Sequence, residues 1–101
     1  MRQRQITERE KSLIQLYTYC SLGMTPERFY TKWDVNQNDI GLICSRSTST
    51  VSRWFSKGRN RRNPSTNDLR HLAVMDFLLE HFEDIPEELR NLLCPLDSRH
   101  P

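Results

Sequence analysis

Residues 37–58 read QNDIGLICSRSTSTVSRWFSKG, and this stretch decides the fold that we expect for the chain. Its apolar and small residues have the spacing of two short helices that pack on each other across a turn of three or four residues. We expect the turn around residues 44–47 and the second helix over about residues 48–57, with Gly58 ending it. The stretch therefore predicts a helix-turn-helix, whose packing residues are Ile40, Gly41, Cys44, Val51 and Trp54.

The second predicted helix and the segment after it carry charge of one sign. Residues 45–52 are rich in hydroxyl side chains. Hydroxyl groups are short donors suited to phosphate oxygens and base edges. A helix that is basic, hydroxylated and without acids suits the major groove of DNA. The pattern predicts double-stranded DNA as a partner, without indicating its sequence. No Asp or Glu occurs from Ile40 to Asn67, whereas six cations do: Arg46, Arg53, Lys57, Arg59, Arg61 and Arg62.

Helical spacing continues on both sides of this stretch, and no alternating strand pattern of useful length occurs. Residues 25–27, Thr-Pro-Glu, have the order of a helix start: a capping hydroxyl, a proline at the first position and an acid. Asn36 is placed to cap the first helix of the pair, and Ser65 or Thr66 to cap a long, leucine-rich helix. We therefore expect an all-α fold, a compact bundle of five or six helices that contains the helix-turn-helix.

The chain divides into a central domain over residues 25–82 and two flanking segments. Residues 1–24 hold one predicted helix with an apolar stripe, and residues 83–101 hold a short helix and a tail. A length of 101 residues suits one domain with a single modest core. The apolar residues of the flanking segments are candidates for dimerisation; they are Leu13, Leu16, Tyr17 and Cys20 at one end and Leu89, Leu92 and Leu93 at the other.

The net charge of +2 conceals a strong segregation along the chain. Residues 40–67 carry +6, whereas residues 69–93 carry six acids against Arg70 and Arg90, a balance of −4. We expect the positive part to approach phosphate first. The acids Glu80, Glu83, Asp84, Glu87 and Glu88 form either a solvent face or a surface that meets a basic partner protein.

The sequence gives no support for a zinc protein, a membrane-spanning protein or an enzyme. Cys20, Cys44 and Cys94 form neither a CxxC motif nor a zinc-ligand pair with a histidine. We expect buried thiols in a reducing cytosol and hence a cytoplasmic, nucleoid-associated protein, the alternative being an intermolecular disulfide through Cys20 or Cys94. No apolar run approaches the roughly 20 residues of a membrane span. No catalytic motif occurs, so we expect no enzyme, no metal and no cofactor.

Residues 25–82 resemble the Cro/lambda-repressor type of helix-turn-helix domain, which is common among small prokaryotic regulators. That family opens its first helix with glutamine, here Gln37, and continues downstream with a glycine, a proline-serine pair and a leucine-rich helix. The resemblance departs at two positions, since the family usually has alanine where Gly41 stands and glycine where Ser45 stands. The matching residues are Gln37, Ile40, Gly41, Cys44, Val51, Trp54, Gly58, Pro64, Ser65, Leu69, Leu72 and Ala73.

The resemblance implies roles for individual residues on DNA. The start of the second helix usually meets base edges, and the residues expected to do so are Thr48, Ser49, Ser52 and Arg53. Contacts with the phosphate backbone are expected from Gln37, Arg46, Ser47, Thr50, Lys57, Arg59, Arg61 and Arg62.

The function that we expect is a sequence-specific transcriptional regulator, a repressor by its resemblance, that acts as a homodimer. One alternative is an architectural or accessory DNA-binding subunit of a mobile-element or replication complex. The other is a protein-interaction adaptor that has kept the helix-turn-helix fold. The acid-free stretch from Ile40 to Asn67 disfavours the adaptor, because an adaptor has no need to exclude Asp and Glu there.

Overall fold

The computed structural model describes residues 3–19 and 22–92, and this part of the chain is all-helical, with six α-helices and no strand. The expected all-α class is confirmed for these residues. Leu93, Cys20 and Cys94 lie outside them. The helices are α1 (Glu8–Tyr19), α2 (Pro26–Lys32), α3 (Gln37–Cys44), α4 (Thr48–Phe55), α5 (Thr66–Glu80) and α6 (Glu87–Leu92), with short 3-10 turns η1 (Gly58–Asn60) and η2 (Phe82–Asp84).

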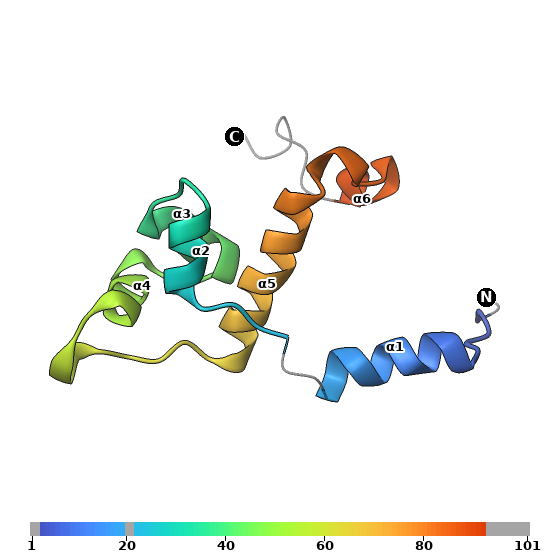
Figure 1. Ribbon diagram of the computed structural model, residues 1–101, viewed down its shortest axis with the longest axis horizontal. Helices are drawn as coiled ribbons and strands as arrows, with labels where there is room; N and C mark the ends of the chain where they lie inside the picture. The colour runs from blue at the N-terminus through green and yellow to red at the C-terminus, as the bar shows by residue number, and fades with distance from the viewer. Residues whose placement is uncertain (1–2, 20–21, 93–101) are drawn as a thin grey trace.

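The compact part of the molecule is formed by α2, α3, α4 and α5, which enclose one small core (Figure 1). Trp54 of α4 and Phe29 of α2 are its largest buried side chains. At the edge of this core, the indole N–H of Trp33 donates a hydrogen bond of 3.0 Å to the Asp76 carboxylate. The core therefore joins the α3–α4 pair to the long helix α5; its buried apolar residues are Met24, Phe29, Ile40, Cys44, Val51, Trp54 and Leu72.

The helix starts in this compact part follow the predicted capping residues. Thr25 Oγ1 accepts a 3.1 Å hydrogen bond from the Arg28 amide, and Pro26 takes the first helical position of α2. Asn36 begins α3 and Ser65 begins α5, each with a reciprocal capping box. The prediction of these starts is confirmed because caps depend on residues three apart, which the sequence displays.

Helix α4 ends at Phe55, two residues before the predicted end. The Ser56 hydroxyl donates a 3.0 Å hydrogen bond to the Ser52 carbonyl, which a continuing helix would use for the Ser56 amide. The Ser56 amide bonds to the Arg53 carbonyl instead, and Ser56 itself is extended. Gly58, with φ of 79°, then begins η1 rather than capping α4.

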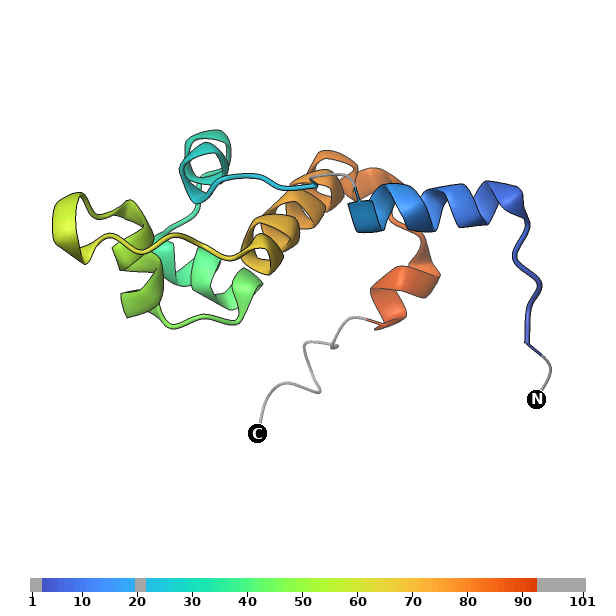
Figure 2. The same ribbon diagram turned by 90° about the horizontal axis from the view of Figure 1, so that it is seen from below.

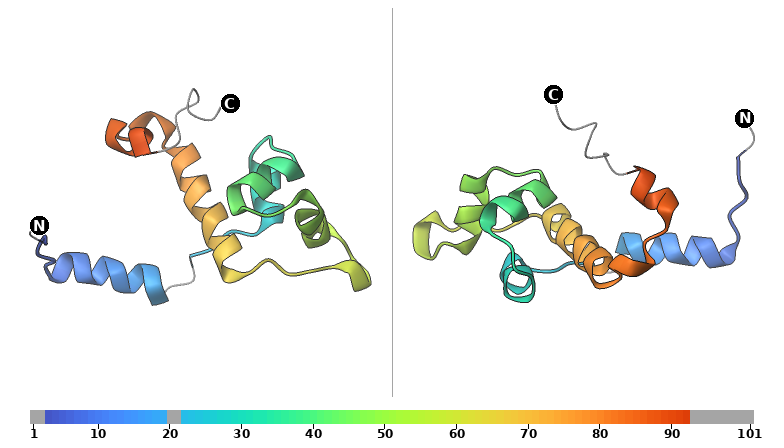
Figure 3. Two further views of the ribbon diagram at one scale, coloured as in Figure 1. Left: turned by 180° about the vertical axis from the view of Figure 1, so that it is seen from behind. Right: turned by 90° about the horizontal axis from the view of Figure 1, so that it is seen from above.

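Helix α1 extends away from the compact part, and α6 lies beyond the far end of α5 (Figures 1 and 2). The radius of gyration, 16.6 Å, exceeds the roughly 13 Å of a compact chain of this length. Figure 3 shows α1 and η1 at opposite ends of the molecule. None of the helices in the described part is both long and apolar enough to cross a bilayer.

Candidate nucleic-acid interface

The turn between α3 and α4 is three residues long and lies close against α3. The Arg46 amide donates a 2.8 Å hydrogen bond to the Gly41 carbonyl. A β-carbon at Gly41 would lie 2.6 Å from the Arg46 carbonyl oxygen, so this position excludes any side chain. Ser45 adopts the left-handed conformation, with φ of 58° and ψ of 45°. The two positions that depart from the resemblance, Gly41 within α3 and Ser45 in the turn, thus lie where the turn packs against α3.

This tight turn orients α4 so that one face is buried and the other is exposed. Val51 and Trp54 point into the core, at 0% and 2% exposure. The four residues predicted to contact bases lie on the opposite face, and all four are exposed: Thr48, Ser49, Ser52 and Arg53. Residues three and four apart on a helix are neighbours, so these side chains form one continuous strip along α4.

The strip extends onto α3 through Asn38, a residue that sequence reasoning missed. The Thr48 hydroxyl donates a 3.1 Å hydrogen bond to Asn38 Oδ1, which holds the two exposed side chains together. The side-chain amide of Asn38 is a donor and lies on the same surface as the α4 strip. Its position directly after Gln37 is the one signal in the sequence, and it becomes meaningful only when α3 and α4 are packed.

Gln37, Ser47 and Thr50 lie at helix starts whose polar groups are already engaged. Gln37 is half-buried at the first position of α3, where the Asp39 carboxylate accepts a hydrogen bond from the Asn36 amide. Ser47 Oγ accepts a 3.2 Å hydrogen bond from the Thr50 amide and so caps α4. An anion at the start of α3 would meet the Asp39 charge, whereas the start of α4 contains no acid.

Arg46 is paired with a buried carboxylate. Its Nε and Nη2 atoms lie 2.9 and 3.3 Å from the Asp68 carboxylate oxygens. Asp68, with a side-chain exposure of 4%, also accepts hydrogen bonds from the Ser65 amide and hydroxyl. Burial by itself would raise the pKa of Asp68, but the hydrogen bonds from Arg46 and Ser65 hold it below its ordinary value. Arg46 therefore links the α3–α4 turn to the start of α5.

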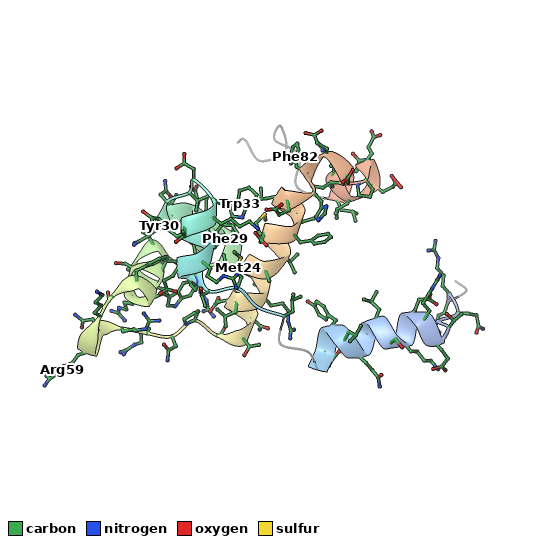
Figure 4. The ribbon with its side chains drawn as sticks, in the orientation of Figure 1. Met24, Phe29, Tyr30, Trp33, Arg59 and Phe82 are labelled. Atoms are coloured by element: carbon green, nitrogen blue, oxygen red, sulfur yellow. The ribbon has the colours of Figure 1, made fainter. Side chains whose placement is uncertain are left out.

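The basic segment after α4 is attached to that helix at its C-terminal end. Arg61 Nη1 donates a 2.9 Å hydrogen bond to the Trp54 carbonyl and lies 3.5 Å from the Glu27 carboxylate. The Arg62 amide donates a 3.1 Å hydrogen bond to the Arg53 carbonyl. Figure 4 shows Arg59 at the outer tip of this loop, pointing away from the helices. A long basic loop is thus held in a definite position beside α4.

A shallow hollow lies between α4, this loop and the start of α5. Arg53 and Arg62 line it together with Arg46, whose charge is already offset by Asp68. Thr50, Ser65 and Asn63 add hydroxyl and amide groups, and Trp54 and the paired Asp68 also line the hollow. Arginine, hydroxyl and amide donors are the groups that bind phosphate oxygens in proteins.

Several basic side chains on this side of the molecule have no acidic partner, as is also true of Arg4, Arg28, Arg70 and Arg90 in other parts of the described chain. In residues 3–19 and 22–92, no carboxylate lies within salt-bridge distance of the four basic side chains Arg53, Lys57, Arg59 and Arg62. All four are exposed. The structure therefore brings the α4 strip, Asn38 and four exposed cations together, while it gives Arg46 and Arg61 internal partners.

Cys44 has a structural environment. It is 5% exposed, and its thiol donates to the Asp68 carbonyl across 3.6 Å. Burial raises the pKa of Cys44 to about 11, and the nearby Asp68 charge acts in the same direction. The expectation of a buried thiol is confirmed for this cysteine.

Comparison of the chain with models of known protein families, with curated proteins and with solved structures found no match.

Proposed function

We propose that the protein is a sequence-specific DNA-binding transcriptional regulator whose α3–α4 pair is a helix-turn-helix of the Cro/lambda-repressor type. In this proposal α4 enters the major groove, and α3 lies across its mouth. The observation that carries the proposal is the exposed strip of Thr48, Ser49, Ser52 and Arg53 beside a fixed basic loop, on a surface where the nearby acids already have partners.

The contacts divide into base reading and backbone binding. Thr48 and Ser49 open α4, where a recognition helix reaches deepest, and Asn38 adds an amide beside them. Lys57, Arg59 and Arg62 extend past the end of α4 and are positioned for the phosphates flanking the groove. Arg53 faces both surfaces, because it belongs to the α4 strip and also lines the hollow with Arg62.

Regulation follows most simply from occlusion of a promoter by a dimer. A single module of this size buries a small DNA surface and discriminates poorly against random sites. Two modules place their recognition helices one turn of DNA apart, roughly 34–36 Å. A homodimer on a pseudo-palindrome is therefore the form that we propose to be active.

The test begins with the selection of preferred duplexes from a random library. Binding of the selected duplex and of a random duplex is then measured by fluorescence anisotropy. We expect Arg53→Ala to weaken binding to the selected duplex by about 1–3 kcal/mol and to affect the random duplex much less. The matched control is Arg28→Ala, which removes the same charge from an exposed position on α2.

The outcomes separate the proposal from its rivals. Equal losses on both duplexes would make Arg53 a phosphate contact and move base reading to Thr48, Ser49 and Asn38. Selection of no preferred sequence, with long cooperative binding, would favour an architectural subunit. The absence of any DNA binding at low salt would overturn the proposal.

A further inference from the structure

Helix α1 has an apolar face that the other residues described by the structure leave largely exposed. The face comprises Leu13, Ile14, Leu16 and Tyr17, which are 65%, 52%, 58% and 49% exposed. On the side of α5, the Arg70 guanidinium stacks over the Tyr17 ring at 4.8 Å, and Tyr17 lines a hollow together with His71 and Val74. A lone helix of 12 residues is marginal in water, so α1 requires a surface to pack against. We call these four residues the α1 face.

A second uncovered apolar surface lies at the other end of α5. Phe77 and Phe82 are 62% and 52% exposed there, with the Arg90 guanidinium over one face of the Phe82 ring at 4.7 Å. Figure 4 shows Phe82 at the α6 end of the molecule. Beside them is a hollow with an almost wholly apolar lining, which we call the α6 hollow. It is lined by Phe77, Leu78, His81, Asp84, Ile85, Pro86 and Leu89.

The two surfaces are separated within one chain. The segment that follows α1 is attached near the start of α5, where the Met24 amide donates a 3.0 Å hydrogen bond to the Leu69 carbonyl. The α6 hollow lies at the opposite end of α5, where Phe77 and Leu78 of that helix line it together with residues of the following segment. Figure 1 shows α6 at this end of α5. Each chain thus presents a protruding apolar helix and an apolar hollow at different ends of the same long helix.

Opposite charges lie near the two surfaces. Glu83, Asp84, Glu87 and Glu88 are exposed in the segment that forms the α6 hollow, and Asp84 lines it. Helix α1 itself is neutral, because Arg9 and Lys11 are offset by Glu10 and Glu8, but Arg4 just before it has no carboxylate partner among residues 3–19 and 22–92. A helix with an apolar face and a cation before its first turn is compatible with an apolar hollow beside acids.

We propose that the α1 face of one copy of the chain occupies the α6 hollow of a second copy, and that the second copy returns the same contact. The exchange is symmetric, so it closes at two copies. Half-exposed large apolar side chains contribute roughly 100 Å² each, given the 150–250 Å² of a fully buried aromatic. Six of them in each copy, and so twelve in the dimer, give a total buried area of roughly 1,200 Å², which reaches the lower range of stable interfaces.

This inference rests on the proposed function only in naming the dimer that would bind DNA. The same exchange leaves α4 and the basic loop uncovered, because α1 and η1 lie at opposite ends of the molecule (Figure 3). Dimerisation is measured without DNA, so a failure of the interface and a failure of DNA binding give different results.

The experiment is a complementation between two variants of the full chain, measured by sedimentation velocity at micromolar concentration. Leu16→Glu damages the α1 face, and Phe77→Glu damages the α6 hollow. Each places a charge at an apolar contact, so we expect each to raise the dimer Kd by roughly a hundredfold or more. Both positions are exposed in the single chain, and circular dichroism verifies that the helices persist. Leu42→Glu, at a 72% exposed position on α3, is the matched control.

The decisive sample is an equimolar mixture of the two variants. An exchanged dimer of one Leu16→Glu chain and one Phe77→Glu chain keeps one intact contact, because an undamaged α1 face meets an undamaged hollow. We expect the mixture to dimerise at concentrations where each variant alone is monomeric, and the Leu42→Glu control to dimerise as the parent chain does.

Three results would overturn the proposal. A parent chain that stays monomeric would show that α1 packs within its own chain. A Phe77→Glu variant that still dimerises would indicate that α1 faces pack on each other. A mixture that stays monomeric would exclude pairing of the two different surfaces.

Discussion

At Gly41 the turn leaves no space for a side chain, and this makes a precise prediction about stability. Gly41→Ala improves helix propensity by about 1 kcal/mol, yet its β-carbon would lie 2.6 Å from the Arg46 carbonyl oxygen. Overpacking against backbone costs about 1–3 kcal/mol. We expect a net loss in the free energy of unfolding, measured by urea denaturation, and a weaker DNA affinity because the turn positions α4.

Ser45, in the turn that contacts Gly41, allows the opposite substitution, in which glycine replaces a residue with a side chain. Its φ of 58° is a conformation that glycine adopts without cost and serine does not. Ser45→Gly should therefore raise the free energy of unfolding by up to about 1 kcal/mol. A gain from Gly41→Ala, or a loss from Ser45→Gly, would show that the turn is arranged differently.

The lowered pKa of Asp68 predicts that the free energy of unfolding depends on pH. Its pKa lies below the ordinary value of 3.8, so the ionised form is favoured by folding. The contribution is complete above pH 3.8 and is lost as the pH falls through the lowered pKa of the folded state. Asp68→Asn should cost about 1–3 kcal/mol at neutral pH, because it weakens the pairing with Arg46 and Ser65.

The measurement for Asp68 is the difference in unfolding free energy between the two proteins at about pH 7 and about pH 3. Asp76, whose pKa is lowered mainly by its hydrogen bond with Lys32, titrates in both proteins and cancels in the difference. We expect the difference to shrink in acid. A difference that stays constant would mean that the Asp68 pairing contributes no net stability.

The basic loop makes a prediction at the scale of one element. Each phosphate neutralised by a cation contributes about −0.9 to the slope of log K against log salt concentration. Replacing Arg59 and Arg62 by alanine together should flatten the slope by nearly 2 units and weaken all DNA sequences alike. An unchanged slope in this double variant would show that the loop stays in solvent when DNA is bound.

Arg61 serves as the contrasting residue in the same loop. Its guanidinium is bonded to the Trp54 carbonyl and lies close to Glu27. We expect Arg61→Ala to lower the thermal midpoint more than Arg59→Ala does, and to change the salt slope less. The comparison separates cations that hold the loop in place from cations that are available to DNA.

For the whole molecule, the removal of α1 should separate folding from assembly. The buried core lies entirely within residues 24–72, so a chain lacking residues 1–22 should retain its helices. The intact dimer should unfold at temperatures that rise with protein concentration, because association stabilises the folded form by mass action. The shortened chain should lose that dependence and its cooperative binding to paired half-sites. Loss of the helices on truncation would instead assign α1 to the core.

The sequence by itself determined the helices of the compact part and the polarity of α4. Capping residues such as Thr25, Asn36 and Ser65 act over three positions, and the alternation of Val51 and Trp54 with exposed hydroxyls follows the helical period. These are local relations, so they can be read along the chain. The end of α4 was misplaced because the Ser56 hydroxyl competes for a backbone carbonyl, an interaction that composition does not reveal.

Only the tertiary structure decided which basic residues are available for a partner. Arg46 and Arg61 look like Arg59 and Arg62 in the sequence, but their partners Asp68, Glu27 and the Trp54 carbonyl come from other elements. The pairing of Thr48 with Asn38 and the uncovered α1 face also depend on how helices meet. Long-range contacts of this kind depend on the relative placement of whole elements, which the local spacing of residues leaves open.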